Sequence, residues 1–166
     1  DCVPILLADP IARVVGGIHA GWRSAVAGIM KNTIDAMCSL GAKKENIIIF
    51  PHRIAPEKRL DLFERLANHP DLRHYEFVVP MKMNVSKTEY HSWLQRAKFA
   101  VSFADQETLG ISMYESACAG ACPIVPNRLS YTEMYDPMFK QADSIDEAVA
   151  AILKYEQYNV AGQIAQ

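Results

Sequence analysis

The hydrophobic positions in the first forty residues predict a β-hairpin followed by a helix. Residues 3–8 and 13–20 are apolar runs on either side of an Asp-Pro turn, which is typical of two paired strands. Between Ser24 and Leu40 the apolar side chains recur every three or four positions, as on the buried face of an amphipathic helix. Gly41 suits the residue that ends such a helix.

The rest of the chain alternates between short apolar runs and helical patterns. The apolar runs, which predict buried strands, are residues 47–51, 75–81, 98–104 and 122–126. Helix starts are indicated by Pro56 and by two capping boxes, Ser86 with Glu89 and Ser144 with Glu147. This alternation predicts an α/β fold with a parallel, Rossmann-like sheet that carries helices on both faces. We expect the hairpin and first helix to pack on this sheet, because so short a segment would rarely be stable alone.

One strand-loop-helix-strand unit, residues 103–126, carries the clearest candidate chemistry. A polar loop ends in Glu107, and Thr108, Leu109 and Gly110 then open a helix. A helix start presents unpaired N–H groups that suit an anion, and Gly110 allows a ligand to approach closely.

Two carboxylates flank this helix start. Glu107 and Glu115 can face the same crevice at the carboxyl end of the sheet, where ligands bind in open α/β folds. Carboxylates bind vicinal hydroxyls, so together with the helix start they would suit a sugar nucleotide. The alternative is that both carboxylates are solvated surface groups.

Two cations follow the first strand of the predicted parallel sheet. Arg53 lies just beyond the strand, and Lys58 lies at the start of the next helix. Cations at this edge of the sheet are well placed for a diphosphate. The alternative is that they are ordinary surface charges.

The composition excludes some classes of partner but does not identify one. The 166 residues are half apolar and 22% charged, as in a globular domain. A formal charge of −2 gives no general attraction to nucleic acid. No apolar run of about eighteen residues is present, so no membrane span is expected, and we predict a cytoplasmic protein. The chain opens at Asp1 without a signal peptide or Met, which suggests a fragment.

The four cysteines do not have the spacing of a strong metal site. Cys118 and Cys122 lie four residues apart with no His nearby in sequence, whereas zinc sites usually combine two close pairs. Buried thiols of a reduced protein are the favoured interpretation.

The segment before residue 47 carries a specific resemblance. Asp1 to Pro10 (DCVPILLADP), the His-Ala-Gly-Trp-Arg stretch at 19–23 and the helix that follows resemble the middle of the polyphenol oxidoreductase (laccase) domain family, some members of which act as purine nucleoside phosphorylases or deaminases. The resemblance implies that Cys2 and His19 match two of the three zinc-type ligands of that family. The alternative is that His19 ends a strand and Cys2 packs in a core.

Residues 47–155 resemble a second family. Arg53 and Lys58, the pair Glu107 and Glu115, and the segment 126–133 are similar to the C-terminal donor-binding domain of a GT-B glycosyltransferase of family 4 type. The resemblance implies a nucleotide-diphosphate sugar of uridine or guanosine type and no required cofactor. The implied roles are catalysis for Glu107 at the donor sugar, and donor binding for Arg53, Lys58, Thr108, Leu109, Gly110 and Glu115.

The sequence therefore predicts a mosaic of two parts. Residues 1–46 form a laccase-like hairpin and helix that does not stand alone, and residues 47–166 form a nucleotide-sugar-binding domain. We expect glycosyl transfer by resemblance, with turnover lacking in the absence of an acceptor domain, and exposed strand edges near the join that allow a homodimer. The alternatives are a metal-dependent laccase-domain oxidoreductase or purine nucleoside phosphorylase fragment with zinc at the N-terminal segment, and a chimeric scaffold without function.

Overall fold

The fold comprises two compact units, residues 1–44 and residues 45–166. A computed structural model gives the fold and describes residues 3–9, 13–21, 23–24, 28–40, 45–135, 139 and 143–164. The assignment of separate functions to residues 1–46 and 47–166 stays a prediction, as does the packing of the hairpin on the sheet. Gly41 and Cys2 lie outside the described residues.

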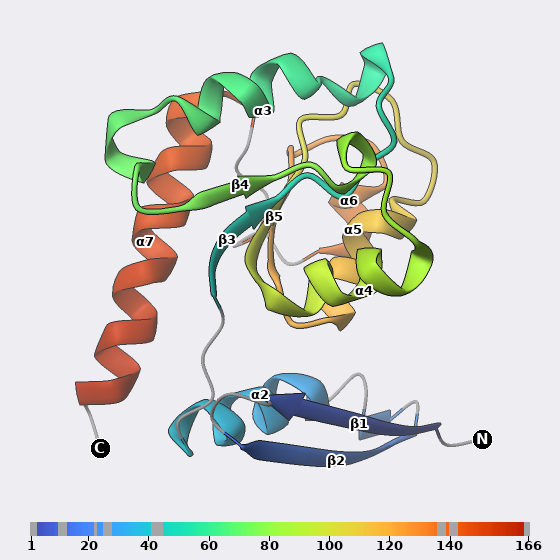
Figure 1. The fold of residues 1–166 in the computed structure, drawn as a ribbon, viewed down its shortest axis with the longest axis vertical. Coiled ribbons are helices and arrows are strands. Elements are labelled where there is room, and N and C mark those ends of the chain that lie inside the picture. The colour runs from blue at the N-terminus through green and yellow to red at the C-terminus, as the bar shows by residue number, and fades with distance from the viewer. Residues whose placement is uncertain are drawn as a thin grey trace. The chain divides into compact units, whose positions relative to one another are not determined.

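The smaller unit contains the predicted hairpin and a helix that packs against it (Figure 1). Strands β1 (Val3–Asp9) and β2 (Val14–Ala20) pair antiparallel, with Leu7 opposite Gly16. Because side chains alternate along a strand, one face of the hairpin turns Leu7 and Val14 toward Met37 in a small apolar cluster. The other face leaves Leu6 81% exposed and Val15 72% exposed.

Helix α2 (Ile29–Ser39) lies close to β2, and a glycine makes this possible. A Cβ at Gly16 would lie 2.6 Å from Met37 Sδ and 2.9 Å from Thr33 Cγ2. Arg23 and Ser24 are helical, as the pattern predicts, but Gly28 takes a left-handed backbone with φ of 77°, so α2 itself begins only at Ile29.

The larger unit contains the predicted parallel sheet, with strand order β4-β3-β5-β6 (Figure 1). The strands are β3 (Glu45–Ile49), β4 (Glu76–Val78), β5 (Ala97–Val101) and β6 (Cys122–Ile124). All three pairings are parallel, as expected for strands joined by helical crossovers. The α/β fold with helices on both faces of a parallel sheet and an N-terminal antiparallel hairpin is therefore confirmed.

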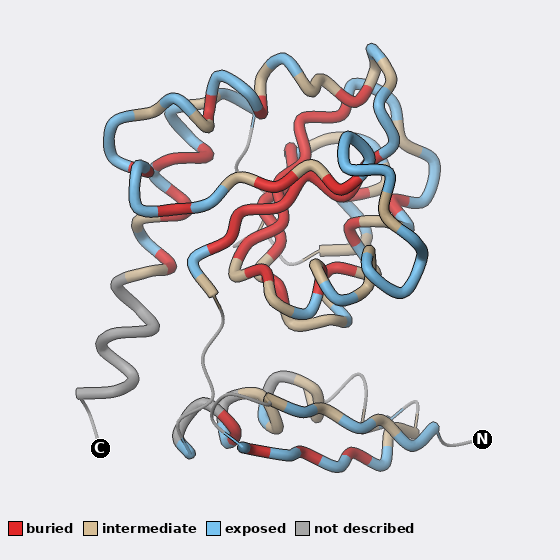
Figure 2. Tube along the Cα trace, viewed as in Figure 1, coloured by how far each residue is buried: buried red, intermediate tan, exposed pale blue. Residues whose placement is uncertain are grey.

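Two apolar cores lie on opposite faces of this sheet, and the central strands β3 and β5 are buried over most of their length (Figure 2). Along β3, Ile48 faces one core while Ile47 and Ile49 face the other, as alternation requires. Helices α3 (Leu60–Ala67) and α7 (Ile145–Ile164) cover the Ile48 face. The opposite face is covered by α4 (Lys87–Arg96), α5 (Ile111–Cys118) and α6 (Tyr131–Met134).

Local sequence signals account for the starts of α4, α7 and three short 3-10 turns. Ser86 Oγ accepts from the Glu89 amide, and the Glu89 carboxylate accepts from the Ser86 amide, so this predicted capping box is confirmed. Ser144 Oγ accepts from the Glu147 amide at the start of α7. Short 3-10 turns at Pro56–Lys58, Pro70–Leu72 and Pro80–Lys82 each begin with a proline.

Helix α5 begins later than its sequence pattern predicts. The helix was expected to open at Thr108, but it starts at Ile111 because Gly110 precedes it in the left-handed conformation with φ of 68°. A Cβ at Gly110 would lie 2.8 Å from Tyr131 Cε1, so the glycine also lets the Tyr131 ring approach the helix start. Within the described part of the chain, no helix is both long and apolar enough to cross a membrane.

Candidate functional site

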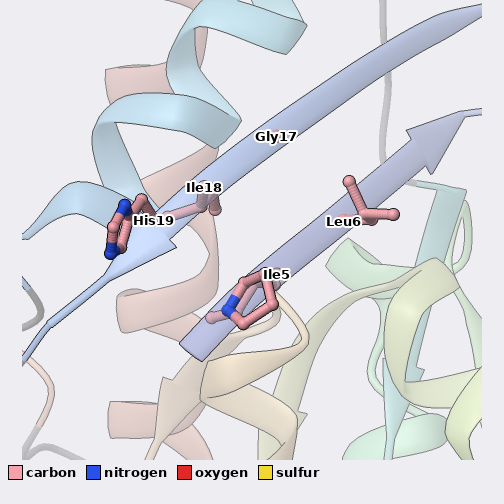
Figure 3. A pocket seen from close by; sticks show the side chains of 6 residues that line it. Ile5, Leu6, Gly17, Ile18 and His19 are labelled. Atoms are coloured by element: carbon pink, nitrogen blue, oxygen red, sulfur yellow. The ribbon is translucent and has the colours of Figure 1, made fainter. Parts of the chain in front are cut away.

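The hairpin unit carries a hollow of about 530 Å³ beside its strands (Figure 3). Its lining is Pro4, Ile5, Leu6, Gly17, Ile18 and His19. Leu6 pairs with Gly17 and Pro4 with His19 across the two strands, so residues far apart in sequence share this surface. A volume of this size is within the range of small-molecule sites.

His19 is the ionisable group of this hollow, and a local turn holds it in place. It is exposed and lies near the end of β2. The Gly21 amide donates to Ser24 Oγ over 2.9 Å, and the Ser24 hydroxyl lies 3.0 Å from the Gly21 carbonyl oxygen and 3.4 Å from that of His19. This turn ties the end of β2 to the segment that follows it. The backbones of His19 and Gly21 therefore have a structural role in addition to the candidate functional role of the His19 side chain.

The described residues do not by themselves fit a bound metal ion. No group of three or more His, Cys, Asp or Glu side chains suitable for a metal is found among them. Cys2, the other predicted ligand, lies outside the described residues. A single imidazole, that of His19, is too small a ligand set to hold a zinc ion.

The larger unit brings polar residues together at the carboxyl ends of β3 and β5. Lys58 Nζ lies 2.9 Å from Glu107 Oε2 and donates to the Gln106 carbonyl oxygen over 2.6 Å. The two charged side chains are only 9% and 15% exposed. Two residues that are 49 positions apart in the sequence therefore form a largely buried ion pair.

The Glu107 carboxylate is held by several donors at once. Burial works to raise its pKa, but hydrogen bonds from Lys58 and from the Gly110 and Thr108 amides outweigh burial, and the pKa stays below its ordinary value. The backbone amides of Thr108 and Gly110 therefore bind a carboxylate of the protein itself, that of Glu107. Leu109 is 56% exposed beside it.

The other predicted residues lie apart from this pair. Arg53 is 69% exposed and forms an ion pair with Glu57 four residues further along the chain. Glu115 lies near Tyr90 on the neighbouring helix, where burial and then the charge of Glu115 raise the pKa of Tyr90 to about 12. Whether any of these residues contacts a ligand stays a prediction.

Sequence reasoning missed a buried hydrogen-bond network centred on His52, which is 2% exposed. Its Nε2 lies 2.8 Å from Ser102 Oγ, and its Nδ1 lies 3.0 Å from Ser112 Oγ and 4.0 Å from Glu107 Oε2. Ser102 Oγ lies in turn 3.1 Å from the Tyr131 hydroxyl. The sequence does carry one signal for this network. His52 and Ser102 are polar residues that lie just after two buried strands, β3 and β5, which are neighbours in the sheet.

Burial lowers the pKa of His52 from 6.5 to about 4. The positive charge of Lys58 adds to this effect, and the negative charge of Glu107 opposes it. The imidazole is therefore neutral near pH 7, with one nitrogen that donates and one that accepts.

Comparison with known proteins places similarity at the N-terminus of the chain. Residues 1–57 match the family described as multi-copper polyphenol oxidoreductase laccase. A purine nucleoside phosphorylase of Deinococcus radiodurans is 51% identical over 47 residues, which is 28% of this chain and 19% of that protein. A human purine nucleoside phosphorylase is 38% identical over 50 residues, 30% of this chain and 12% of the relative.

A third relative has a different named activity. An adenosine deaminase from an unknown prokaryotic organism is 47% identical over 47 residues, 28% of this chain and 18% of that protein. This chain thus spans about a fifth or less of the length of these three relatives. The predicted resemblance of the N-terminal segment to the laccase and purine nucleoside phosphorylase family is confirmed.

These similarities overturn the main functional prediction. A glycosyltransferase donor domain that binds a nucleotide-diphosphate sugar was expected, whereas the family match and the named relatives are of the laccase and purine nucleoside phosphorylase kind. The resemblance of residues 47–155 to a glycosyltransferase finds no support among them. The physical reason for the error is that a Glu pair about a strand-loop-helix turn is generic to parallel α/β sheets, and a fold does not determine a function.

Proposed function

We propose that the hairpin unit forms part of a purine nucleoside site, with the base bound in the hollow beside β1 and β2. The observation that carries this proposal is a hollow of about 530 Å³ lined by hairpin residues within the segment that matches the purine nucleoside phosphorylases. The names of those relatives describe activity on purine nucleosides. We propose that this chain takes part in the same kind of activity.

The lining of the hollow has the chemistry that a purine base needs. Leu6 is 81% exposed, and a planar ring placed over it would remove apolar surface from water. Gly17 contributes no side chain, so a flat ring can approach the strand backbone. The imidazole of His19 can donate to a ring nitrogen or exocyclic oxygen of the base and so fix its orientation.

Cys2 and His19 remain the predicted ligands of the N-terminal segment, and a further ligand would have to come from outside the described residues. The proposal assigns recognition of the base to the hairpin unit, with His19 as the polar contact.

A titration of the ¹⁵N-labelled protein with inosine, adenosine and guanosine tests this proposal. We expect amide shifts concentrated at Leu6, Gly17 and His19, and about tenfold weaker binding for His19→Ala, since one hydrogen bond contributes about 1.5 kcal/mol at most. His91→Ala, on helix α4, is the matched control and should bind as the wild type does. Shifts confined to residues 45–135, or equal affinity for His19→Ala, would overturn the assignment.

Hydrolytic or phosphorolytic turnover is a second readout. Release of hypoxanthine from inosine, with and without phosphate, distinguishes phosphorolysis and hydrolysis from binding alone. Uridine is the control ligand, because a pyrimidine presents less ring surface to the apolar lining.

A further inference from the structure

A hydroxyl group and a neutral imidazole meet at the start of helix α5. Ser112 is the second residue of this helix and is half-buried, and its Oγ lies 3.0 Å from His52 Nδ1. His52 comes from the segment after β3, so residues 60 positions apart are brought within hydrogen-bond distance. This is the distance expected between a nucleophile and its general base.

The other ring nitrogen of His52, Nε2, forms a hydrogen bond inside the protein. Nε2 lies 2.8 Å from Ser102 Oγ, which accepts from the Ala104 amide over 3.3 Å and lies beside the Tyr131 hydroxyl. With the proton on Nε2, His52 donates to Ser102, and Nδ1 is left to accept the Ser112 proton. The network also fixes the orientation of the His52 ring. A general base needs such a fixed orientation to accept the proton of its nucleophile.

We propose that Ser112 and His52 form a nucleophile and base pair that reacts with carboxylic esters at the carboxyl end of the sheet. This inference does not depend on the purine site, which lies in the other unit. Neither the sequence patterns nor the similar proteins give a role to the pair of Ser112 and His52.

Glu107 is the charged neighbour that favours the proton transfer. When Nδ1 takes the Ser112 proton, the imidazolium that forms lies 4.0 Å from the Glu107 carboxylate. Lys58, which pairs with Glu107 over 2.9 Å, works against that charge more strongly than the carboxylate favours it, so Glu107 offsets its effect only in part. The first-turn amides of α5 have no acceptor within the helix, and they can stabilise the oxyanion of a tetrahedral intermediate.

The balanced reaction is ester hydrolysis in two steps. Ser112 Oγ attacks the carbonyl carbon, its proton passes to His52, and the alcohol leaves with that proton, so that the acyl group is carried by Ser112. Water then attacks the acyl carbon, the carboxylic acid leaves, and the Ser112 hydroxyl is restored. The net change consumes one ester and one water and yields one acid and one alcohol.

Exposed apolar side chains beside Ser112 indicate the substrate class. Leu109 is 56% exposed and Ile111 is 59% exposed, at the turn that leads into the helix and at its first residue. An apolar acyl chain would bury part of this surface. We therefore assign short aliphatic esters, rather than charged ones, to the pair.

Labelling with an alkyl fluorophosphonate tests the inference on the full chain. Ser112 Oγ would attack phosphorus, fluoride would leave, and the proton would pass to His52, which gives a stable adduct that mass spectrometry can locate. We expect the adduct on Ser112, and none on Ser86, which caps helix α4. No adduct on Ser112 in the folded protein, or adducts on other residues alone, would overturn the proposal.

Rates with p-nitrophenyl butyrate provide the second measurement. We expect Ser112→Ala and His52→Gln each to lower the rate at least about a hundredfold, within the usual contribution of general base catalysis. Ser144→Ala, which changes a serine at the start of helix α7, is the control and should react at the wild-type rate. If His52→Gln fails to fold, Ser112→Ala still decides, because an unchanged rate in that variant would overturn the inference.

Discussion

The buried imidazole of His52 should make the larger unit lose stability in mild acid. Burial, and then the charge of Lys58, lowers the pKa of His52 to about 4 in the folded protein, against 6.5 for the free group. Because the folded pKa lies below the unfolded one, the unfolded chain takes up the proton first as the pH falls. Stability is therefore complete above pH 6.5 and is lost as the pH falls toward 4.

The magnitude follows from the same two values. The difference between 6.5 and about 4 corresponds to about 3 kcal/mol of unfolding free energy, a large part of the stability of an ordinary domain. Urea unfolding at about pH 7 and about pH 4.5, followed by the methyl signals of Ile48 and Ile152 in the larger core, would measure most of this loss.

The matching variant isolates the contribution of the imidazole. His52→Gln can still donate to one serine and accept from the other, but it does not titrate. We expect its unfolding free energy to fall by about 2 kcal/mol less than that of the wild type over the same pH interval, with His91→Gln as control. The reasoning is refuted if His52→Gln shows the same acid dependence as the wild type, or if NMR finds that the folded imidazole titrates near the ordinary pKa of 6.5.

Two further predictions concern packing and charge. Lys58→Met leaves Glu107 without its cation, and we expect the free energy of urea unfolding to fall by about 3 kcal/mol. Adding Glu107→Gln should recover part of this stability. If the effects of the two substitutions are strictly additive, the pairing is contradicted. Gly16→Ala should destabilise the hairpin unit by about 2 kcal/mol in thermal unfolding because its Cβ would overlap Met37. Gly17→Ala meets only a contact at 3.9 Å and should be neutral, so equal effects of the two substitutions would count against the close approach.

The layered fold follows from local patterns, but the ends of its elements do not. Alternating apolar runs and helical periodicity predict the parallel sheet, because burial on both faces imposes them directly on the sequence. The break at Gly28 before α2 was missed, and the start of α5 was placed too early, because both Gly28 and Gly110 adopt left-handed conformations. A glycine can be accommodated within a helix or can end it, and tertiary contacts decide which.

The candidate sites show a similar division. Lys58 and Glu107 were expected at one edge of the sheet because the carboxyl ends of parallel strands meet there, and the structure pairs them. The contacts of His52 with Ser102 and Ser112 depend on strand register and on the rotation of α5, which no local pattern encodes. Long-range hydrogen bonds of this kind become visible only when the sheet is assembled.

Function was the least predictable property, because generic and specific motifs look equally persuasive in one sequence. The Glu pair around Gly110 suggested a sugar nucleotide, yet that spacing is compatible with any strand-loop-helix unit. The distinctive stretch that contains His19 and Gly21 was the better guide, since the family match covers it.

The most direct test of the purine proposal is an inosine titration of the ¹⁵N-labelled protein, read at the amides of Leu6, Gly17 and His19. The account predicts saturable shifts at these hairpin residues, with binding about tenfold weaker in His19→Ala and weaker for uridine than for inosine. Hairpin amides that do not move at millimolar inosine, while the protein remains folded, would contradict the assignment of the hollow to a purine nucleoside.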